Sequence, residues 1–275
     1  MLDKLTAINT LRTTQVESVK TENPTTKTYT FIDVRCAKAK PGQFLMLWIP
    51  GIDEIPLSIM DTTGVSVSVT VKNVGDATRH LHAMKRGDTI GVRGPFGNHF
   101  IPSYGKVLLV GGGTGIAPLL YLAKQLATKA KRLSFIIGAK TQNELLFLNQ
   151  LEPLCTEPPT ATTEDGTYGL KCLITQPLAK LLAEKGKQSF DMIYACGPER
   201  MTIQVFNLAE KHHVPLEASL ERLMRCGIGI CGSCMIGKYR VCKDGPVFNS
   251  QRLRKVKDEL GMSKLGFDGN RIPTN

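Results

Sequence analysis

The feature that most constrains the fold is a change in hydrophobic pattern near residue 105 of the 275-residue chain. Over residues 10–101, short β-rich runs alternate with Gly, Pro and Asp residues that favour turns. No helix of good length is expected before residue 101, and residues 77–85 are interpreted as a turn. Several short, closely spaced strands are typical of a small closed or Greek-key β-barrel.

After residue 105, strands alternate with helices. The apolar run at residues 106–110 predicts a buried strand, and the pattern of residues 116–131 predicts an amphipathic helix. The same reasoning predicts strands at residues 133–140, 160–165, 191–196 and 214–220, and helices at residues 141–154, 173–186 and 199–213. Thr141 and Glu144 have the spacing of a capping box for one of these helices. Such alternation predicts a parallel sheet with helices on both faces.

The expected fold class is therefore a β-barrel plus an α/β domain. The hydrophobic fraction of 42% is sufficient for a substantial core. We predict a barrel domain at residues 1–101, a parallel-sheet domain at residues 102–219, and a cysteine-rich segment with a basic tail at residues 220–275.

Four of the eight cysteines lie close together in the last of these segments. Cys226, Cys231 and Cys234 form a C-x4-C-x2-C pattern, and Cys242 follows eight residues later. Plant-type [2Fe–2S] sites begin with this spacing and use a more distant fourth cysteine. Structural zinc usually takes two short knuckles, and only the Cys231/Cys234 pair has that spacing. We interpret the four cysteines as ligands of a [2Fe–2S] cluster, with zinc as the alternative.

Two loops after predicted strands carry small residues. The first has the sequence GGGTGIAP over residues 111–118, where a backbone rich in glycine can approach a pyrophosphate at a helix N-terminus. It departs from G-x-G-x-x-G at Ile116. In the second loop Cys196 is expected to face a bound nicotinamide, because ligands of open parallel sheets lie beyond the carboxyl ends of the strands. The alternative for both loops is a tight structural turn.

Two barrel segments are weaker candidates for flavin binding. Ser58 has a hydroxyl that can hydrogen-bond a flavin ring atom, and the turn at residues 75–78 offers N–H groups to a phosphate. From the residues alone, ordinary barrel strands and turns are the favoured interpretation of both segments.

The formal net charge of +11 is spread along the chain, and only residues 252–257 form a dense basic run. This balance suits the binding of anionic dinucleotides, and we do not expect a nucleic-acid partner. The first residues lack a continuous apolar segment, and nowhere do eighteen apolar residues follow one another. We therefore expect a cytoplasmic protein without a membrane partner.

The order of barrel, dinucleotide domain and four-cysteine segment resembles the ferredoxin-NADP reductase superfamily over nearly the whole chain. Within it, SLERLMRCGIGICGSC (residues 219–234) and VCKDGPVF (residues 241–248) are similar to the electron-transfer subunits of two-subunit, NAD-linked dihydroorotate dehydrogenases. PGQFLMLWIPGIDEIPLSI (residues 41–59) and VKNVGDAT (residues 71–78) are similar to the archaeal branch.

This resemblance implies three cofactors and a set of binding residues for each. FAD is expected at Ile55, Pro56, Leu57, Ser58, Thr70, Val71, Lys72, Gly75, Ala77 and Thr78. NAD is expected at Gly112, Gly113, Thr114, Gly115, Pro118, Cys196, Gly197 and Pro198. The [2Fe–2S] cluster is expected on Cys226, Cys231, Cys234 and Cys242, and no residue is expected to act as an acid or base catalyst.

The resemblance also implies a partner, an FMN-containing dihydroorotate dehydrogenase catalytic subunit, in a hetero-oligomer with two copies of each subunit. Electrons from dihydroorotate would pass through the cluster and FAD to NAD in pyrimidine biosynthesis. Two features depart from the family pattern: Ile55 stands where an arginine is frequent, and only seven residues separate Cys234 from Cys242. Short gaps of this kind also occur in flavin subunits of sulfhydrogenases and anaerobic sulfite reductases, which are the alternative function. A zinc-knuckle, nucleic-acid-binding protein is the alternative from another class.

Overall fold

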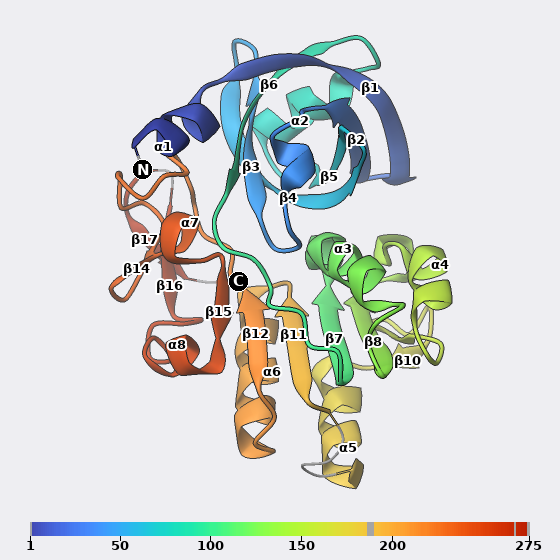
Figure 1. Ribbon diagram of the computed structural model, residues 1–275. Coiled ribbons are helices and arrows are strands. Elements are labelled where there is room, and N and C mark those ends of the chain that lie inside the picture. Colours follow the sequence, from blue (N-terminus) through green and yellow to red (C-terminus); the bar gives the residue numbers. More distant parts are fainter. Residues whose placement is uncertain (1, 186–189, 267, 274–275) are drawn as a thin grey trace.

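The computed structural model describes residues 2–185, 190–266 and 268–273, and it contains a β-barrel and an open α/β sheet (Figure 1). The barrel strands are β1 (Arg12–Asn23), β2 (Thr26–Ile32), β3 (Phe44–Ile49), β4 (Asp53–Thr63), β5 (Ser66–Lys72) and β6 (Thr89–Phe96). They close in the order β1-β2-β5-β4-β3-β6 with antiparallel neighbours. The barrel expected from the sequence is confirmed.

Alternating residues on β5 show why these segments form a barrel. Val67, Val69 and Val71 are buried in the barrel core, whereas Ser66 and Ser68, which alternate with the first two valines, are only partly buried. Successive side chains of a strand point to opposite faces, so this sequence places one apolar row inside the barrel and one polar row outside.

The second part of the fold is a seven-stranded sheet in the order β10-β9-β8-β7-β11-β12-β15. Its strands are β7 (Lys106–Gly112), β8 (Arg132–Ala139), β9 (Thr160–Thr163), β10 (Leu170–Lys171), β11 (Met192–Cys196), β12 (Leu216–Ser219) and β15 (Val247–Asn249). All neighbours are parallel except β12 and β15. The helices that follow its strands are α3 (Ile116–Leu126), α4 (Leu148–Leu151), α5 (Thr175–Lys185) and α6 (Glu199–Lys211). The expected end of α5 at residue 186 lies outside the described residues.

The central strand β7 is buried on both faces. Val107 and Leu109 pack into one hydrophobic cluster with α3, while Leu108 and Val110 pack into another with α6. A strand that is covered on both faces has a nearly continuous apolar sequence, as residues 106–110 have. The parallel sheet predicted from the sequence is thereby confirmed.

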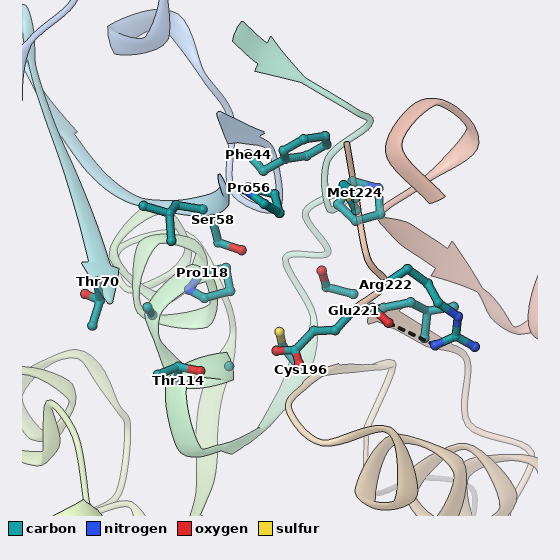
Figure 2. Close-up of a pocket in the computed structure, with 16 residues that line it drawn as sticks. Phe44, Pro56, Ser58, Thr70, Thr114, Pro118, Cys196, Glu221, Arg222 and Met224 are labelled. Carbon is teal, nitrogen blue, oxygen red and sulfur yellow. Dashed lines mark hydrogen bonds between the residues drawn. The ribbon is translucent and has the colours of Figure 1, made fainter. Parts of the chain in front are cut away.

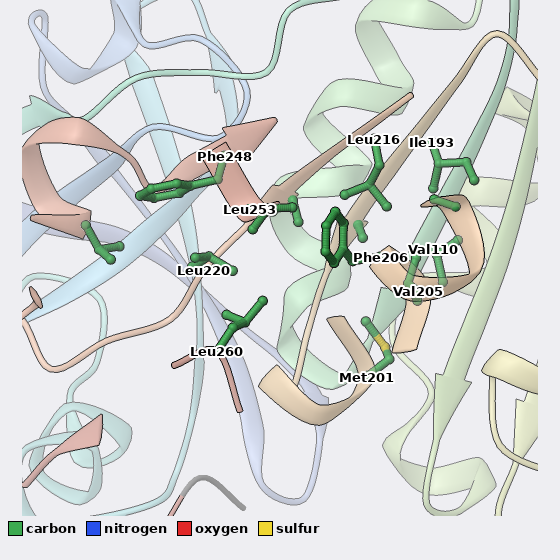
Figure 3. Close-up of a cluster of buried hydrophobic side chains, with 14 of the residues drawn as sticks. Val110, Ile193, Met201, Val205, Phe206, Leu216, Leu220, Phe248, Leu253 and Leu260 are labelled. Carbon is green, nitrogen blue, oxygen red and sulfur yellow. The ribbon is translucent and has the colours of Figure 1, made fainter. Parts of the chain in front are cut away.

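The C-terminal segment adds an edge strand to this sheet. β15 pairs with β12 in antiparallel register, with Phe248 opposite Ala218. Phe248 and Leu253 pack into the same core as Phe206 of α6 and Leu216 of β12 (Figure 3). The cysteine segment is therefore built into the hydrophobic core of the sheet.

The remaining described elements are short. The helices are α1 (Leu2–Asn9), α2 (Asp76–Ala83), α7 (Val241–Asp244) and α8 (Ser250–Arg254). Two small hairpins pair β13 (Met235–Ile236) with β14 (Tyr239–Arg240) and β16 (Ser263–Leu265) with β17 (Arg271–Pro273). In the described part of the chain no helix has the length and apolar character needed to cross a membrane.

Two expectations about helices were wrong. Residues 77–85, interpreted as a turn, contain most of the eight-residue helix α2, and the eight-residue α1 lies before residue 101, where no helix of good length was expected. Residues 141–154 do not form one helix but two 3₁₀ turns and the four-residue α4. Phe147 has φ of 62° and is buried with Leu146, so burial of two consecutive apolar side chains interrupts the helical pattern. Thr141 makes no side-chain capping bond.

Phe248 offers a test of the attachment of the C-terminal segment. Phe248→Ala is expected to lower the free energy of unfolding by about 3–5 kcal/mol, because it leaves a cavity in the core shared with the sheet. Urea denaturation followed by circular dichroism measures this. Leu170→Ala, at a side chain that is 51% exposed, is the matched control and should change stability by less than about 0.5 kcal/mol. Equal effects of the two variants would contradict the packing described.

Candidate functional site

A pocket lies between the barrel and the carboxyl edge of the sheet (Figure 2). The barrel contributes residues from β3, β4 and β5: Phe44, Pro56, Leu57, Ser58 and Thr70. The sheet side and the segment after β12 contribute Thr114, Gly115, Ala117, Pro118, Cys196, Ser219, Leu220, Glu221, Arg222, Met224 and Pro246. Strands β7, β11 and β12 are neighbours, so the chain segments at their carboxyl ends meet at one side of this pocket.

Glycines allow the two loops after β7 and β11 to touch. A Cβ atom on Gly115 would lie 2.5 Å from the backbone of Cys196 and Gly197. A Cβ atom on Gly197 would lie 2.9 Å from the carbonyl oxygen of Gly112. Gly113, in contrast, has φ of +55° and open space beside its Cα. Most of these glycines are needed for loop packing, and Gly113 is the one whose backbone borders free space.

Cys196 is a buried thiol at the end of β11. Burial raises its pKa, and the negative charge of Glu221 acts in the same direction, while a hydrogen bond from the Ser219 hydroxyl opposes them. The side chain therefore stays a neutral thiol at neutral pH. Its sulfur lies beside the Glu221 carboxylate in the pocket (Figure 2).

Glu221 supplies a carboxylate to the same wall of the pocket. Solvent reaches the Glu221 side chain through the pocket. The surrounding protein nevertheless raises the pKa of its carboxyl group by desolvation. The positive charge of Lys264 lowers this pKa, and the negative charge of Glu199 raises it further. Arg222, the next residue, points to the other side of the chain and forms a buried bidentate ion pair with Glu199.

The structure brings eight of the expected flavin and dinucleotide residues into this pocket. They are Pro56, Leu57, Ser58, Thr70, Thr114, Gly115, Pro118 and Cys196. Gly112, Gly113, Gly197 and Pro198 belong to the two touching loops behind it but do not line it. Ile55 and Val71 pack with the barrel core.

The other expected flavin residues lie outside the pocket lining. Lys72 donates to Glu144 at 2.9 Å, a contact that joins the barrel to the sheet domain. Gly75, Ala77 and Thr78 form the first turn of α2. The Thr78 hydroxyl accepts from the N–H of Gly75 at 2.9 Å, so it stabilises the turn itself.

The sequence interpretation missed half of the pocket. The missed residues are Phe44, Ala117, Ser219, Leu220, Glu221, Arg222, Met224 and Pro246. Ser219 and Leu220 end the strand predicted at residues 214–220, and Glu221, Arg222 and Met224 follow it, so the rule that identified Cys196 applies equally to this carboxyl end. Phe44 faces Ser58 across the β3–β4 pair, and Pro246 arrives from a distant segment; neither carries a local signal.

The four clustered cysteines converge as two interacting pairs. Cys226 interacts with the Cys231 thiol, and the Cys242 thiol with Cys234. The charges of Cys231 and Cys234, and of Cys226 and Cys242, also influence each other. Across residues 2–185, 190–266 and 268–273, no group of three or more His, Cys, Asp or Glu side chains is arranged for a single metal ion.

Backbone N–H groups point at two of these sulfurs. Ile230 donates to Cys226 Sγ and Cys242 donates to Cys234 Sγ, both at 3.4 Å. Burial alone would raise the pKa of Cys226, but hydrogen bonds from the backbone lower it to about 6. The Cys242 thiol lowers the pKa of Cys234 to about 7. The thiolate, the form that binds iron, is therefore favoured at Cys226 and Cys234, while the hydrogen bond to Cys234 raises the pKa of Cys242.

Three glycines shape the loop that carries these cysteines. Gly227, Gly229 and Gly232 have φ of +73°, +81° and +76°, values that favour glycine. The loop thus turns tightly enough to direct its N–H groups inward. The cysteine sulfurs and the N–H groups around them fit an iron–sulfur cluster, as the spacing of the cysteines led us to expect.

Comparisons with known proteins define the class. Residues 109–205 match the family described as "Oxidoreductase NAD-binding domain", and residues 221–254, with all four clustered cysteines, match "Iron-sulfur cluster binding domain of dihydroorotate dehydrogenase B". An NADH-dependent reduced ferredoxin-NADP oxidoreductase is similar in structure, with 30% identity over 90% of this chain and 92% of that one and a TM-score of 0.79. A ferredoxin NADP+ reductase from Neisseria gonorrhoeae with bound FAD and NADP shares the fold, with 18% identity, 74% and 91% coverage and a TM-score of 0.63. The chain is an NAD-linked oxidoreductase of the ferredoxin-reductase type with an added iron–sulfur domain.

Similar curated proteins specify the family. The "Probable dihydroorotate dehydrogenase B (NAD(+)), electron transfer subunit" of Methanocaldococcus jannaschii is 39% identical over 94% of this chain and 96% of its own length. The protein of the same description from Methanothermobacter thermautotrophicus is 35% identical over 97% and 99%. The chain belongs to the family of electron transfer subunits of NAD-linked dihydroorotate dehydrogenase B. The resemblance stated from the sequence is thereby confirmed.

Gly115 tests the contact between the two loops. Gly115→Ala is expected to raise KM for NADH by about tenfold or more, because its Cβ atom would push away the Cys196 loop, where we expect the nicotinamide to bind. Steady-state NADH oxidation with an artificial dye measures this. Gly64→Ala is the control for an added methyl group that meets no other atom, since nothing lies within 4 Å of its added carbon; the φ of +60° at Gly64 also makes it a control for backbone strain. An unchanged KM in Gly115→Ala would contradict the assignment.

Proposed function

We propose that this chain carries electrons from an FMN-containing dihydroorotate dehydrogenase catalytic subunit through a [2Fe–2S] cluster and FAD to NAD. The observation that supports this most directly is the path of the chain after β12. Ser219, Glu221 and Met224 line the pocket between barrel and sheet, and Cys226 follows only two residues after Met224. One short segment therefore joins the flavin and nicotinamide pocket to the cluster loop.

FAD fits the barrel side of this pocket. The rings of Phe44 and Pro56 and the side chain of Leu57 offer an apolar surface, and the hydroxyls of Ser58 and Thr70 offer hydrogen bonds to ring atoms. Val71 and Lys72 continue strand β5, and Gly75 precedes α2, whose first-turn N–H groups at Ala77 and Thr78 can bind the phosphates. These residues remain our proposed FAD site.

NAD fits the opposite wall. The open space beside Gly113 and the start of α3 can receive the pyrophosphate, with Thr114 and Pro118 beside it. Cys196, kept neutral by burial, would then face the nicotinamide without placing a charge beside it.

When bound, FAD exchanges hydride with a nicotinamide and single electrons with a cluster. The chain's own part in this is orientation. The barrel wall and the two βα loops hold the two rings against each other and exclude water, so the pocket requires no acid or base residue.

The cluster loop is the proposed contact with the catalytic subunit. Cys231 is exposed and lies beside Ile230, whose side chain is 78% exposed. Cys234 and Cys242 are buried. The cluster would therefore be open on one side, and association of the two subunits there would form the hetero-oligomer that we propose.

Reconstitution tests the proposed function. The chain is mixed with the catalytic subunit, dihydroorotate and NAD, and the absorbance of NADH is followed. We expect NADH to form only when both subunits are present, and the oxygen-protected chain to show flavin and iron–sulfur absorption. NADH formation with a sulfhydrogenase or sulfite reductase partner instead would overturn the choice of partner, and zinc without iron or sulfide would overturn the relay.

A substitution of Cys231 tests the cluster independently of the flavin. Cys231→Ser is expected to lose iron and acid-labile sulfide and to reduce electron transfer with the partner by more than about 100-fold, because losing a ligand costs more than losing a residue that only supports one. FAD content and NADH-driven dye reduction should stay within error of the unmodified chain, because the flavin pocket is formed by other residues. Cys172→Ser, at a partly buried cysteine distant in sequence from the cluster loop, is the matched control. Loss of FAD in Cys231→Ser would show that the loop supports the barrel instead.

A further inference from the structure

Arg93 of β6 connects the barrel to the cluster loop. Its Nε donates to Glu54 Oε1 of β4 at 2.7 Å, and its Nη2 donates to the other carboxylate oxygen of Glu54. Its Nη1 donates to the side chain of Asn9 at the end of α1 and to the backbone carbonyl of Cys226 at 3.3 Å. One guanidinium thus bridges two barrel strands, α1 and the first cysteine of the cluster loop.

The packing around this contact is tight. A Cβ atom on Gly227, the residue after Cys226, would lie 3.1 Å from Met46 and 3.4 Å from the ring of Phe96. Arg93 Cζ lies 5.7 Å from the centre of the same ring. The loop therefore rests directly on the barrel, so the position of the guanidinium relative to Cys226 is well determined.

Water screens this ion pair only partly. The side chains of Arg93 and Glu54 are 14% and 22% exposed. Arg240 makes a similar bond to the loop, from Nη1 to the carbonyl of Gly229 at 3.2 Å, but its side chain is 38% exposed. Charges with little solvent around them act over longer distances and are less weakened by salt.

We propose that Arg93 positions the Cys226 end of the cluster loop and raises the reduction potential of the cluster, and that Glu54 moderates this effect. The proposal rests on the proposed ligation of the cluster by Cys226. A cluster gains one negative charge when it is reduced, so a nearby cation stabilises the reduced form and a nearby anion destabilises it. Arg93 bonds directly to the cysteine segment, whereas Glu54 contacts Arg93.

The two partners of the ion pair are therefore expected to have opposite effects. Arg93→Gln leaves Glu54 uncompensated and should lower the midpoint potential of the cluster. Glu54→Gln leaves Arg93 uncompensated and should raise it. We expect each change to shift the flavin–cluster electron equilibrium by about tenfold, which is about 59 mV for a one-electron couple.

A redox titration of the intact chain, monitored by electron paramagnetic resonance of the cluster, measures both shifts. Asn9→Ala removes a neutral partner of Arg93 and should leave the potential unchanged. Arg93→Lys keeps the charge and should retain most of the unmodified potential. Arg240→Gln, at the more exposed arginine, should lower the potential by less than Arg93→Gln does.

Each outcome has a definite meaning. If Arg93→Gln cannot take up a cluster, the other two variants still test the proposal. A raised midpoint potential in Glu54→Gln with a nearly unchanged one in Arg93→Lys would support it. Shifts of both ion-pair variants in the same direction would indicate structural loosening and overturn the proposal, as would no shift in either. Absence of any cluster signal from the unmodified chain would instead overturn the proposed function.

Discussion

The pairing of β15 with β12 is the interaction on which the arrangement of the three parts depends. It places the cysteine segment at the edge of the sheet, and Phe248 anchors it in the core that also contains Phe206 and Leu216. Met224 and Cys226 lie between β12 and β15 in the sequence, so both ends of their segment are held by the sheet. Backbone pairing at an edge strand has here a functional consequence, because it sets the separation between pocket and cluster loop.

A second constraint is the buried ion pair between Arg222 and Glu199. Glu199 is the first residue of α6, directly after the Cys196 loop, and its carboxylate also accepts from the backbone N–H of Gly261 at 2.5 Å. Both side chains are nearly inaccessible to solvent, so loss of either partner would leave an uncompensated charge, a defect worth about 3–5 kcal/mol. The pair holds the proposed nicotinamide loop, the pocket wall and the C-terminal part of the chain in one geometry.

Local patterns predicted most of the fold and only half of the pocket. The period-two alternation of β5 and the apolar run of β7 are visible in short windows, as is the spacing of the cysteines. Pro246 reaches the pocket only because β15 pairs with a strand almost thirty residues earlier, and such long-range pairing has no local signal. Residues 141–154 carry a helical pattern, but burial of Leu146 and Phe147 against the sheet outweighs their helix propensity.

Burial differs among the four cysteines in a way that suits a cluster between two redox partners. Cys234 and Cys242 are buried against the core of the sheet, Cys226 is partly buried beside the barrel, and Cys231 is exposed. A cluster held by these sulfurs would have a dry side toward the hydrophobic core and an open side toward solvent. The dry side has a low local dielectric, so fixed charges there influence the cluster more strongly than charges on the open side. The partly buried Arg93–Glu54 pair, which contacts Cys226, is therefore the group through which this chain can set the energy of an electron on the cluster.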